Sequence, residues 1–198
     1  AYRAAVAMGE AFGRDPNFTI LIDKHIPVRS GLGGPSTDAA AVIMALCREW
    51  GLDPTDPKID EVARSIGADV PFFLYGPPAY LAGAGDEMRE LFRPLTGTPV
   101  ALVKPLASGV TARDAYVRFD EDPVDVPELE PMLEALRQHD ETAIFVRAAD
   151  VTGSGACVFA VCNTQMAADS IVLDAIKEHG WWGQSAKMEN SGPYIAAG

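Results

Sequence analysis

The sequence holds 198 residues, of which 48% are hydrophobic, and its formal net charge is −12. This length suffices for one large domain or two small ones with a substantial hydrophobic core. The acidic excess argues against a nucleic-acid partner, because binding to a phosphate backbone needs clustered Lys and Arg. The sequence shows neither an apolar run of the ~20 residues that a membrane span needs nor an opening signal segment, so we expect a soluble, cytoplasmic protein without a membrane partner.

The three cysteines are Cys47, Cys157 and Cys162, and they form no C-x-x-C pair. Each lies within an apolar run of the sequence. Cysteines placed in this way in an intracellular protein are typical of buried, reduced thiols. We therefore expect no structural zinc site.

The first part of the chain predicts helices with one strand between them. Apolar residues recur at helical spacing over residues 1–12, 36–50 and 54–66, and a glycine follows each segment. Between the first two helices, Phe18–Lys24 is rich in β-forming residues and is bounded by prolines. This segment predicts a strand that leads into a glycine-rich turn.

The second part of the chain predicts strands that are backed by helices. Strands are expected at Ala79–Ala82 and Thr98–Lys104, on either side of a polar turn at residues 83–87. The other expected elements are a short helix at Thr111–Phe119, a helix at Pro131–His139, a strand at Cys157–Val161, a helix at Met166–His179 and an extended segment from Trp181. The acidic, proline-containing stretch Glu121–Glu130 is expected at the surface.

The glycine-rich turn runs from Pro27 directly into the alanine-rich helix, with three glycines at positions 31, 33 and 34. Glycines allow the backbone to approach a ligand closely, and Ser36, Thr37 and Asp38 offer side chains that can cap the helix. The unpaired N–H groups of a helix N-terminus bind anions, so a phosphate is the expected ligand. The alternative is a turn without a ligand, because the stretch matches neither the P-loop nor the dinucleotide fingerprint.

Two other features are candidates for a site. Asp69 stands between the end of a helix and the apolar run Val70–Tyr75. A carboxylate against apolar walls is a suitable general base, although Asp69 has the alternative of a cap or turn residue. A second small-residue turn, Thr152–Ala156, is either a tight connection or part of the same site.

Three ordered motifs resemble the GHMP kinase superfamily: the stretch from Pro27 to Ala40, then Gly67–Phe73, then Thr152–Ala160. Val103-Lys104-Pro105, Thr111-Ala112-x-x-Ala115-Tyr116 and the turn at 82–87 are similar to the branch that acts in non-mevalonate isoprenoid biosynthesis. The resemblance implies an α+β GHMP kinase fold. It also implies an ATP-binding domain over residues 1–97, like domain 2 of ribosomal protein S5 but incomplete at its start, and a C-terminal GHMP domain over residues 98–198.

The same resemblance implies ATP-dependent phosphorylation of the 2-hydroxyl of a cytidine-diphosphate-linked polyol, with Mg²⁺ as cofactor. Asp69 would be the catalytic base, and Ser36 would also lie near the metal. The residues implied to bind ATP are Pro27, Gly31, Leu32, Gly33, Gly34, Ser36, Thr37, Asp38 and Ala39. Gly153, Ser154 and Gly155 would line the acceptor side with Thr111, and Tyr116 would stack on the cytosine.

The chain also departs from the family pattern. Family members carry a catalytic lysine in a portion that precedes the segment matching Ala1, so we expect weak or absent turnover from these 198 residues. Lys24 matches a family position outside the active site. Pro35 replaces a glycine and removes one N–H donor from the turn. The alternatives are a nucleotide-binding remnant, an interaction protein with the same scaffold and another GHMP kinase; the protein is expected to be a monomer or homodimer.

Overall fold

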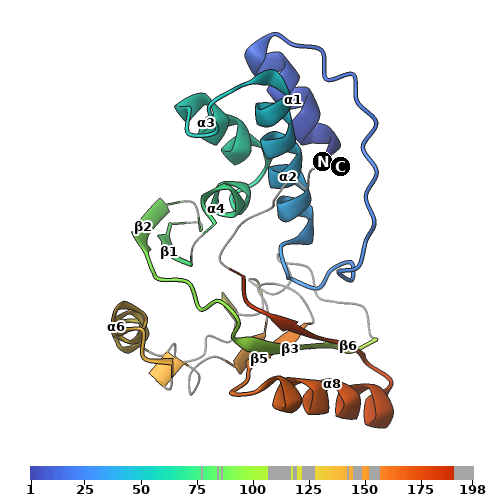
Figure 1. Ribbon diagram of the computed structural model, residues 1–198, viewed down its shortest axis with the longest axis vertical. Coiled ribbons are helices and arrows are strands. Elements are labelled where there is room, and N and C mark those ends of the chain that lie inside the picture. Colours follow the sequence, from blue (N-terminus) through green and yellow to red (C-terminus); the bar gives the residue numbers. More distant parts are fainter. Residues whose placement is uncertain are drawn as a thin grey trace. The chain divides into compact units, whose positions relative to one another are not determined.

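The computed structural model (Figure 1) divides the chain into two compact units, each described by itself. Among the described residues, the first unit contains Ala1–His25 and Gly33–Leu91, and the second contains Ile26–Leu32 and Phe92–Glu189. The domain boundary at residue 97 stays a prediction, since compactness alone does not define a domain. The structure describes residues 1–76, 78–83, 85, 87–106, 117, 120–121, 128–141, 143–144, 149–151 and 157–189.

The first unit packs helices around α2 and carries a β-hairpin. Its described elements are α1 (Tyr2–Phe12), α2 (Gly34–Trp50), α3 (Pro57–Ile66), α4 (Val70–Tyr75), β1 (Ala79–Ala82) and β2 (Glu87–Leu91). Strands β1 and β2 pair antiparallel. The helices predicted at 1–12, 36–50 and 54–66 are confirmed, although α2 begins at Gly34 and α3 at Pro57.

Small side chains bring α1 and α2 together in the core of the first unit. Ala4 and Ala5 of α1 are buried in one cluster with Ala39 and Ala40 of α2. Alanine adds little bulk between two backbones, so the helices can pack closely in the geometry that their ridges allow. Larger residues, with Ile43 fully buried among them, fill the remaining space. The start of α2 is therefore held by a packed core.

The strand predicted at Phe18–Lys24 is wrong, because this segment is extended but belongs to no sheet. From Thr19 to His25 the backbone forms no hydrogen bond with a described residue. A strand is stable only when a neighbour pairs with its N–H and C=O groups, and β-propensity alone supplies no such neighbour. The apolar side chains of the segment remain largely exposed, with Leu21 at 94%.

The sequence also missed two short elements of the first unit. Strand β2 has the sequence EMREL and is mostly exposed, so it lacks the apolar alternation that identifies a strand. Helix α4 spans only Val70–Tyr75, too short for a helical period to be recognised. The polar turn after Ala82 therefore closes a hairpin with β2 rather than leading directly to the strand at Pro99–Lys104.

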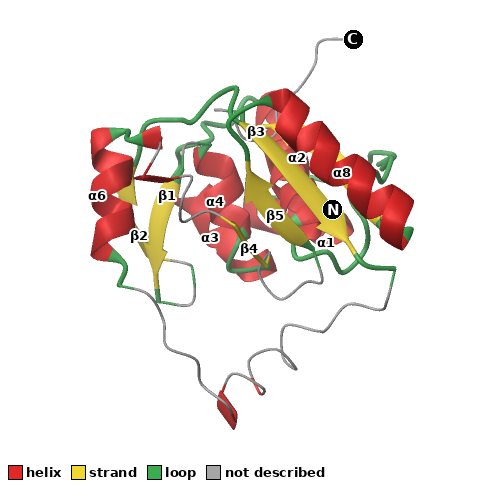
Figure 2. Cartoon of the chain, turned by 90° about the horizontal axis from the view of Figure 1, so that it is seen from below, coloured by secondary structure: helices red, strands yellow, loops and turns green. Residues whose placement is uncertain are grey.

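The second unit contains an antiparallel sheet with the strand order β4-β5-β3-β6. Helix α8 packs against strands β3 and β6 (Figure 1), and Figure 2 shows the helix beside β3. The predicted strands and helices from residue 98 onward are confirmed wherever the structure describes them, except that the helix at Thr111–Phe119 lies outside the described residues apart from residue 117. The described elements are β3 (Pro99–Lys104), α6 (Glu130–Gln138), β4 (Ala149–Val151), β5 (Val158–Val161), α8 (Gln165–His179) and β6 (Trp182–Lys187).

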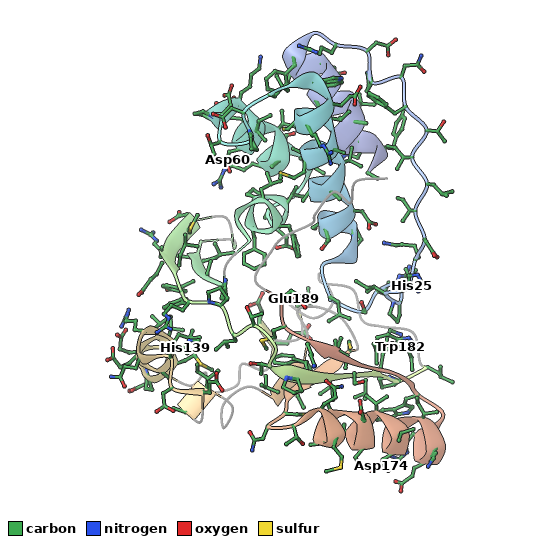
Figure 3. All side chains as sticks on the ribbon, in the orientation of Figure 1. His25, Asp60, His139, Asp174, Trp182 and Glu189 are labelled. Atoms are coloured by element: carbon green, nitrogen blue, oxygen red, sulfur yellow. The ribbon has the colours of Figure 1, made fainter. Side chains whose placement is uncertain are left out.

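Helix α8 shows how the sheet of the second unit is covered. Ala168 and Val172 are buried, whereas Asp174 lies on the outer side of the helix (Figure 3). A Cβ atom on Gly183 of β6 would lie 3.0 Å from Cγ1 of Val172, so the strand and the helix are in close contact there. The α+β class implied by the family resemblance agrees with this arrangement of helices and strands.

Candidate functional site

The glycine turn reaches α2 through residues with left-handed backbone angles. Gly31 has φ 75° and Gly33, the N-cap of α2, has φ 67°. Arg29 has φ 57°, which is uncommon for a residue that carries a side chain. Glycine adopts this region at little cost, so the two glycines set the path by which the chain enters the helix. The segment passes from the second unit to the first between Leu32 and Gly33.

Helix α4 packs against the end of the turn. A Cβ atom on Gly33 would lie 2.7 Å from Cζ of Phe73, which is closer than real side chains approach. Gly33 therefore meets two requirements, the left-handed angle and the contact with the Phe73 ring. Asp69 is the N-cap of the same short helix, one turn before Phe73. Packing thus links two predicted site residues of the first unit, Gly33 and Asp69, through α4.

The first turn of α2 leaves backbone donors available. The N–H groups of Ser36 and Thr37 donate to the carbonyl oxygen of Gly33 at 3.0 and 2.9 Å. The amides of Gly31, Gly33 and Gly34 form no hydrogen bond with a described residue. Pro35 has no N–H group, and in the first turn of a helix this donor is not needed by the helix itself. Unpaired amides at a helix N-terminus can bind an anion.

The predicted side-chain caps of α2 are wrong. Gly33 is the N-cap and no side chain accepts a hydrogen bond from the first-turn amides. The Thr37 hydroxyl instead donates to the carbonyl oxygen of Gly33 at 3.1 Å. A cap must precede the first turn, whereas Ser36, Thr37 and Asp38 lie within it or beyond it because the helix begins at Gly34. These side chains are therefore not needed to close the helix end.

Ser36 and Asp38 differ in their surroundings. The half-buried Ser36 hydroxyl forms no hydrogen bond with a described residue, so its oxygen is available to a ligand or metal. The Asp38 carboxylate is paired with Lys24, whose Nζ lies 2.5 Å from Oδ2. Within the described residues, no three His, Cys, Asp or Glu side chains converge on a metal-binding position. Ala39 is buried in the core of the first unit, and its methyl side chain has no polar atom that could bind a ligand.

Asp69 is exposed, so the expected burial of its carboxylate against apolar walls is wrong. As the N-cap of α4 it lies at the surface, while Val70 and Phe73 contribute to the core. The Asp69 side chain neither caps the helix nor forms a hydrogen bond or ion pair with a described residue. It is therefore not engaged as a structural cap, and its oxygens remain accessible to a substrate proton.

The remaining predicted residues fall into two groups. Pro27 and Leu32 are half-buried in the second unit, near the buried Ser30, whose hydroxyl accepts from the Leu32 amide at 3.4 Å. The predicted acceptor-side residues lie outside the described residues, so their convergence with the glycine turn stays a prediction. They are Thr111, Tyr116, Gly153, Ser154 and Gly155.

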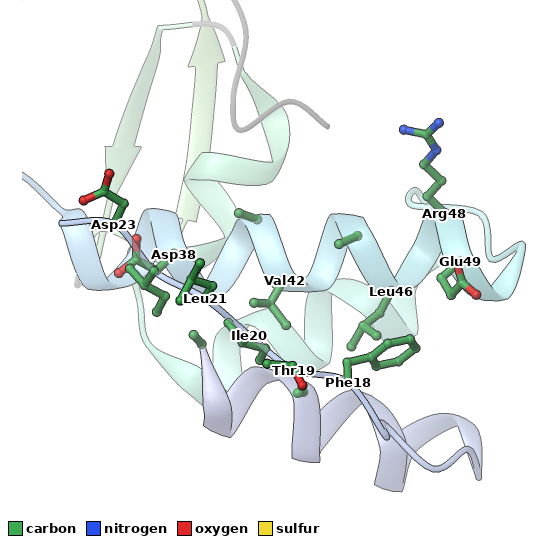
Figure 4. Close-up of a pocket in the computed structure, with 15 residues that line it drawn as sticks. Phe18, Thr19, Ile20, Leu21, Asp23, Asp38, Val42, Leu46, Arg48 and Glu49 are labelled. Atoms are coloured by element: carbon green, nitrogen blue, oxygen red, sulfur yellow. The ribbon is translucent and has the colours of Figure 1, made fainter. Parts of the chain in front are cut away.

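A groove of about 780 Å³ runs along α2 beside the extended segment Phe18–Asp23. In Figure 4, Val42 and Leu46 of α2 face Ile20 and Phe18 of that segment. Of the predicted site residues that the structure describes, Asp38 alone lines this groove, near one end of it. The groove is therefore distinct from the row of unpaired amides at the glycine turn.

Two contacts near the candidate site were not predicted from the sequence. Phe73 contacts Gly33, which lies 40 positions earlier in the chain, and no local sequence pattern predicts this contact. The pairing of Lys24 with Asp38 also bridges separate elements. Lys24 and Asp38 are both visible in the sequence, but their pairing depends on the tertiary fold.

All three cysteines are buried without a disulfide, as the sequence predicts. In the described part of the chain, no helix has both the length and the apolarity needed to cross a bilayer.

Family models match both parts of the chain. The model described as GHMP kinases N terminal domain matches residues 1–77, and that described as GHMP kinases C terminal matches residues 117–180. A 4-diphosphocytidyl-2-C-methyl-D-erythritol kinase from Exiguobacterium sibiricum is 35% identical over 73% of this chain and 50% of its own length. The enzyme of the same name from a Geobacter species is 30% identical over 94% of this chain and 75% of its own length.

A solved structure supports the same relationship. A crystal structure of a 4-(cytidine 5'-diphospho)-2C-methyl-D-erythritol kinase matches with a TM-score of 0.71 and 28% identity, covering 94% of this chain and 76% of that chain. The chain spans about half to three quarters of the length of the curated relatives named above. On the strength of both family models and of these relatives, the chain belongs to the GHMP kinases and, among them, to the family of the 4-diphosphocytidyl-2-C-methyl-D-erythritol kinases.

Proposed function

We propose that this protein transfers the γ-phosphoryl group of ATP to the 2-hydroxyl of 4-diphosphocytidyl-2-C-methyl-D-erythritol, a step of non-mevalonate isoprenoid biosynthesis. The observation that carries the proposal is the pair of amides of Gly33 and Gly34 at the start of α2, neither of which forms a hydrogen bond with a described residue, in a member of this kinase family. A row of N–H donors at the positive end of a helix suits the triphosphate of ATP.

The glycine turn would hold the triphosphate through its backbone. Phosphoryl transfer depends mainly on positioning and on stabilising the charge of the phosphoryl oxygens, and amide donors supply both. Pro35 removes one donor from the row. The Phe73 ring leaves no room for a side chain at Gly33, which keeps this end of the turn free of a Cβ atom. Pro27, Leu32 and Ala39 would shape the turn around the nucleotide.

Asp69 would act as the general base. Its carboxylate would accept the proton of the acceptor hydroxyl while the hydroxyl oxygen forms a bond to the γ-phosphorus. The bond between the γ-phosphorus and the bridging oxygen breaks, and ADP leaves with that oxygen. The accessible, unpaired carboxylate of Asp69 supports this role, because no protein partner among the described residues competes for the proton.

Magnesium is part of the proposal as the cofactor of the transfer. A bound Mg²⁺ would neutralise charge on the phosphate oxygens. The hydroxyl of Ser36 would be its protein ligand, and this oxygen fits the role since it has no hydrogen bond within the described residues. Thr37 is a weaker candidate, because its hydroxyl already donates to Gly33. On the acceptor side, we propose Thr111, Gly153, Ser154 and Gly155, with Tyr116 stacked on the cytosine.

The proposal is tested by measuring phosphoryl transfer from labelled ATP to the cytidine-linked acceptor. Single-turnover conditions, with protein in excess of ATP, detect transfer even when turnover is slow. We expect the unmodified protein to form labelled product slowly, and we expect Asp69→Asn to lower that rate at least about 10²-fold, since general bases contribute this much or more. The readout is the rate of acceptor-dependent product formation.

Asp15→Asn is the matched control, since it removes one exposed carboxylate from the same unit. We expect this variant to transfer phosphate at the unmodified rate. Unchanged activity in Asp69→Asn would overturn the role of Asp69. ATP consumption that does not depend on the acceptor would overturn the proposed substrate.

A further inference from the structure

The ion pair between Lys24 and Asp38 closes a loop around the glycine turn. Nζ of Lys24 lies 2.5 Å from Oδ2 of Asp38, and the two side chains are 41% and 28% exposed. The residues are 14 positions apart, and the chain between them contains every predicted ATP-binding residue except Asp38 itself and Ala39. The pair therefore joins the entry of the loop to the helix into which the loop leads.

This pair is the described polar contact that anchors the extended segment to α2. Backbone groups from Thr19 to His25 form no hydrogen bond with a described residue. Among the described residues, the other polar side-chain contact of that range stays within it, between His25 and Asp23. An extended segment without a pairing partner loses little by moving away from the helix. Removing the lysine would therefore loosen the path by which the chain enters the turn.

The pair also changes the electrostatic field at the start of α2. Asp38 follows the first turn of the helix, close in sequence to the amides proposed to hold the triphosphate. An uncompensated carboxylate at this point would repel an anionic ligand, and a lysine in direct contact cancels most of that repulsion. Asp38 without Lys24 would therefore oppose phosphate binding, whereas neutral Asn would not.

We propose that Lys24 is a positioning residue that acts through Asp38: it holds the extended segment against α2 and neutralises Asp38 at the phosphate end of the helix. The first effect is a property of the folded chain. The second rests on the proposed function, because it requires ATP to bind at the glycine turn. Two measurements separate these effects.

The first measurement is the rate of cleavage after Arg29 by an arginine-specific protease, without any ligand. Arg29 is exposed within the loop that the ion pair closes. We expect Lys24→Met and Asp38→Asn each to raise this rate about threefold, as the modest strength of a surface ion pair allows. The double variant should be no faster than either single variant, and Lys24→Arg should match the unmodified protein.

Cleavage after Arg64, within helix α3, is the internal control and should not change between these variants. Equal rates after Arg29 in all variants would overturn the anchoring role. Additive increases in the double variant would also overturn it, because they would show that Lys24 and Asp38 act separately.

The second measurement is ATP affinity by calorimetric titration, with KM and kcat measured separately. We expect Lys24→Met to raise the dissociation constant for ATP about tenfold with little change in kcat. In the double variant Lys24→Met/Asp38→Asn, the logarithm of this constant should return at least halfway to the unmodified value. If Lys24→Met lowers ATP affinity by the same factor whether residue 38 is Asp or Asn, the proposal is overturned, because Lys24 would then act on the nucleotide without Asp38. If the unmodified protein fails to bind ATP, the proposed function fails, and the protease rates alone decide the anchoring role.

Discussion

The glycine turn and the extended segment before it are neighbours in the sequence with opposite structural support. The turn enters α2 at Gly33, which contacts Phe73, and α2 continues into the buried Ala39 and Ala40. The segment Phe18–Lys24 has the apolar, β-forming residues of a strand but lacks a pairing neighbour among the described residues. Packing therefore holds the turn at the start of α2, whereas the segment would need a partner strand to take its regular form.

The same difference distinguishes the glycine turn, the candidate nucleotide site, from the groove along α2. The groove along α2 is lined by apolar residues such as Phe18, Val42 and Leu46, and none of the glycines of the turn lines it. Phosphate recognition depends on oriented donors rather than on volume. The comparison therefore favours the turn for the triphosphate, and the groove plays no part in the proposed transfer.

A matched pair of leucines tests the contrast between packed and unpacked regions. Leu46 of α2 is 5% exposed and belongs to the core, whereas Leu21 is 94% exposed. We expect Leu46→Ala to lower the free energy of unfolding by about 2–5 kcal/mol. Leu21→Ala should change it by less than about 0.5 kcal/mol. Urea denaturation measures both, and a loss above about 1 kcal/mol for Leu21→Ala would show that the segment is packed in solution.

Gly33 provides the next largest effect. Alanine at this position must take φ 67° and place its Cβ atom against the Phe73 ring. The backbone term costs about 1–2 kcal/mol, and the steric contact adds to it. Gly13→Ala is the control, because Gly13 has φ 60° and a Cβ atom there would meet no described atom within 4 Å. Equal losses of unfolding free energy in the two variants would contradict the contact between the turn and α4.

The smallest effect is a pH dependence at Cys47. Burial, and then the carboxylates of Asp53 and Asp56, raise the pKa of this thiol above its ordinary value of 9.0. The folded protein therefore keeps the thiol protonated at pH values where the unfolded chain has lost the proton. The resulting stabilisation is complete below pH 9.0 and is lost as the pH rises through the raised native pKa.

The direction of this pH dependence is tested by urea denaturation at a series of pH values. The unmodified protein is compared with Cys47→Ala. Between about pH 8 and about pH 11, the unmodified protein should lose more unfolding free energy than the variant does. Parallel losses in the two proteins would show that the thiol titrates alike in the folded and unfolded states.

The elements that could be predicted from the sequence are those that local chemistry determines. Gly13 and Gly51 end α1 and α2 in left-handed conformations, as their position after an apolar period predicts. In the second unit, Gly180 ends α8 in the same way, whereas α6 has His139 as its C-cap and the short strand β4 was not predicted. The strand predicted at Phe18–Lys24 was wrong, because the stability of a strand depends on a pairing neighbour that the local sequence does not specify.

The sequence proposes the residues of the candidate site, but it does not predict their environment. The glycine spacing and Asp69 identified the family, yet the expected burial of Asp69 was wrong because α4 turns its apolar residues inward instead. The start of α2 at Gly34 moved Ser36 and Asp38 out of capping positions. Contacts such as Gly33 with Phe73 and Lys24 with Asp38 depend on the tertiary fold, so no local pattern predicts them.

The central claim is that the amides of the glycine turn hold the triphosphate. The most direct measurement is a titration of ¹⁵N-labelled protein with ATP and Mg²⁺, followed through the backbone amide resonances. We predict that the largest shifts occur at Gly31, Gly33 and Gly34, while the helix-ending Gly13 and Gly51 stay unchanged. Shifts confined to the groove residues Phe18–Asp23, or none at all, would contradict the claim.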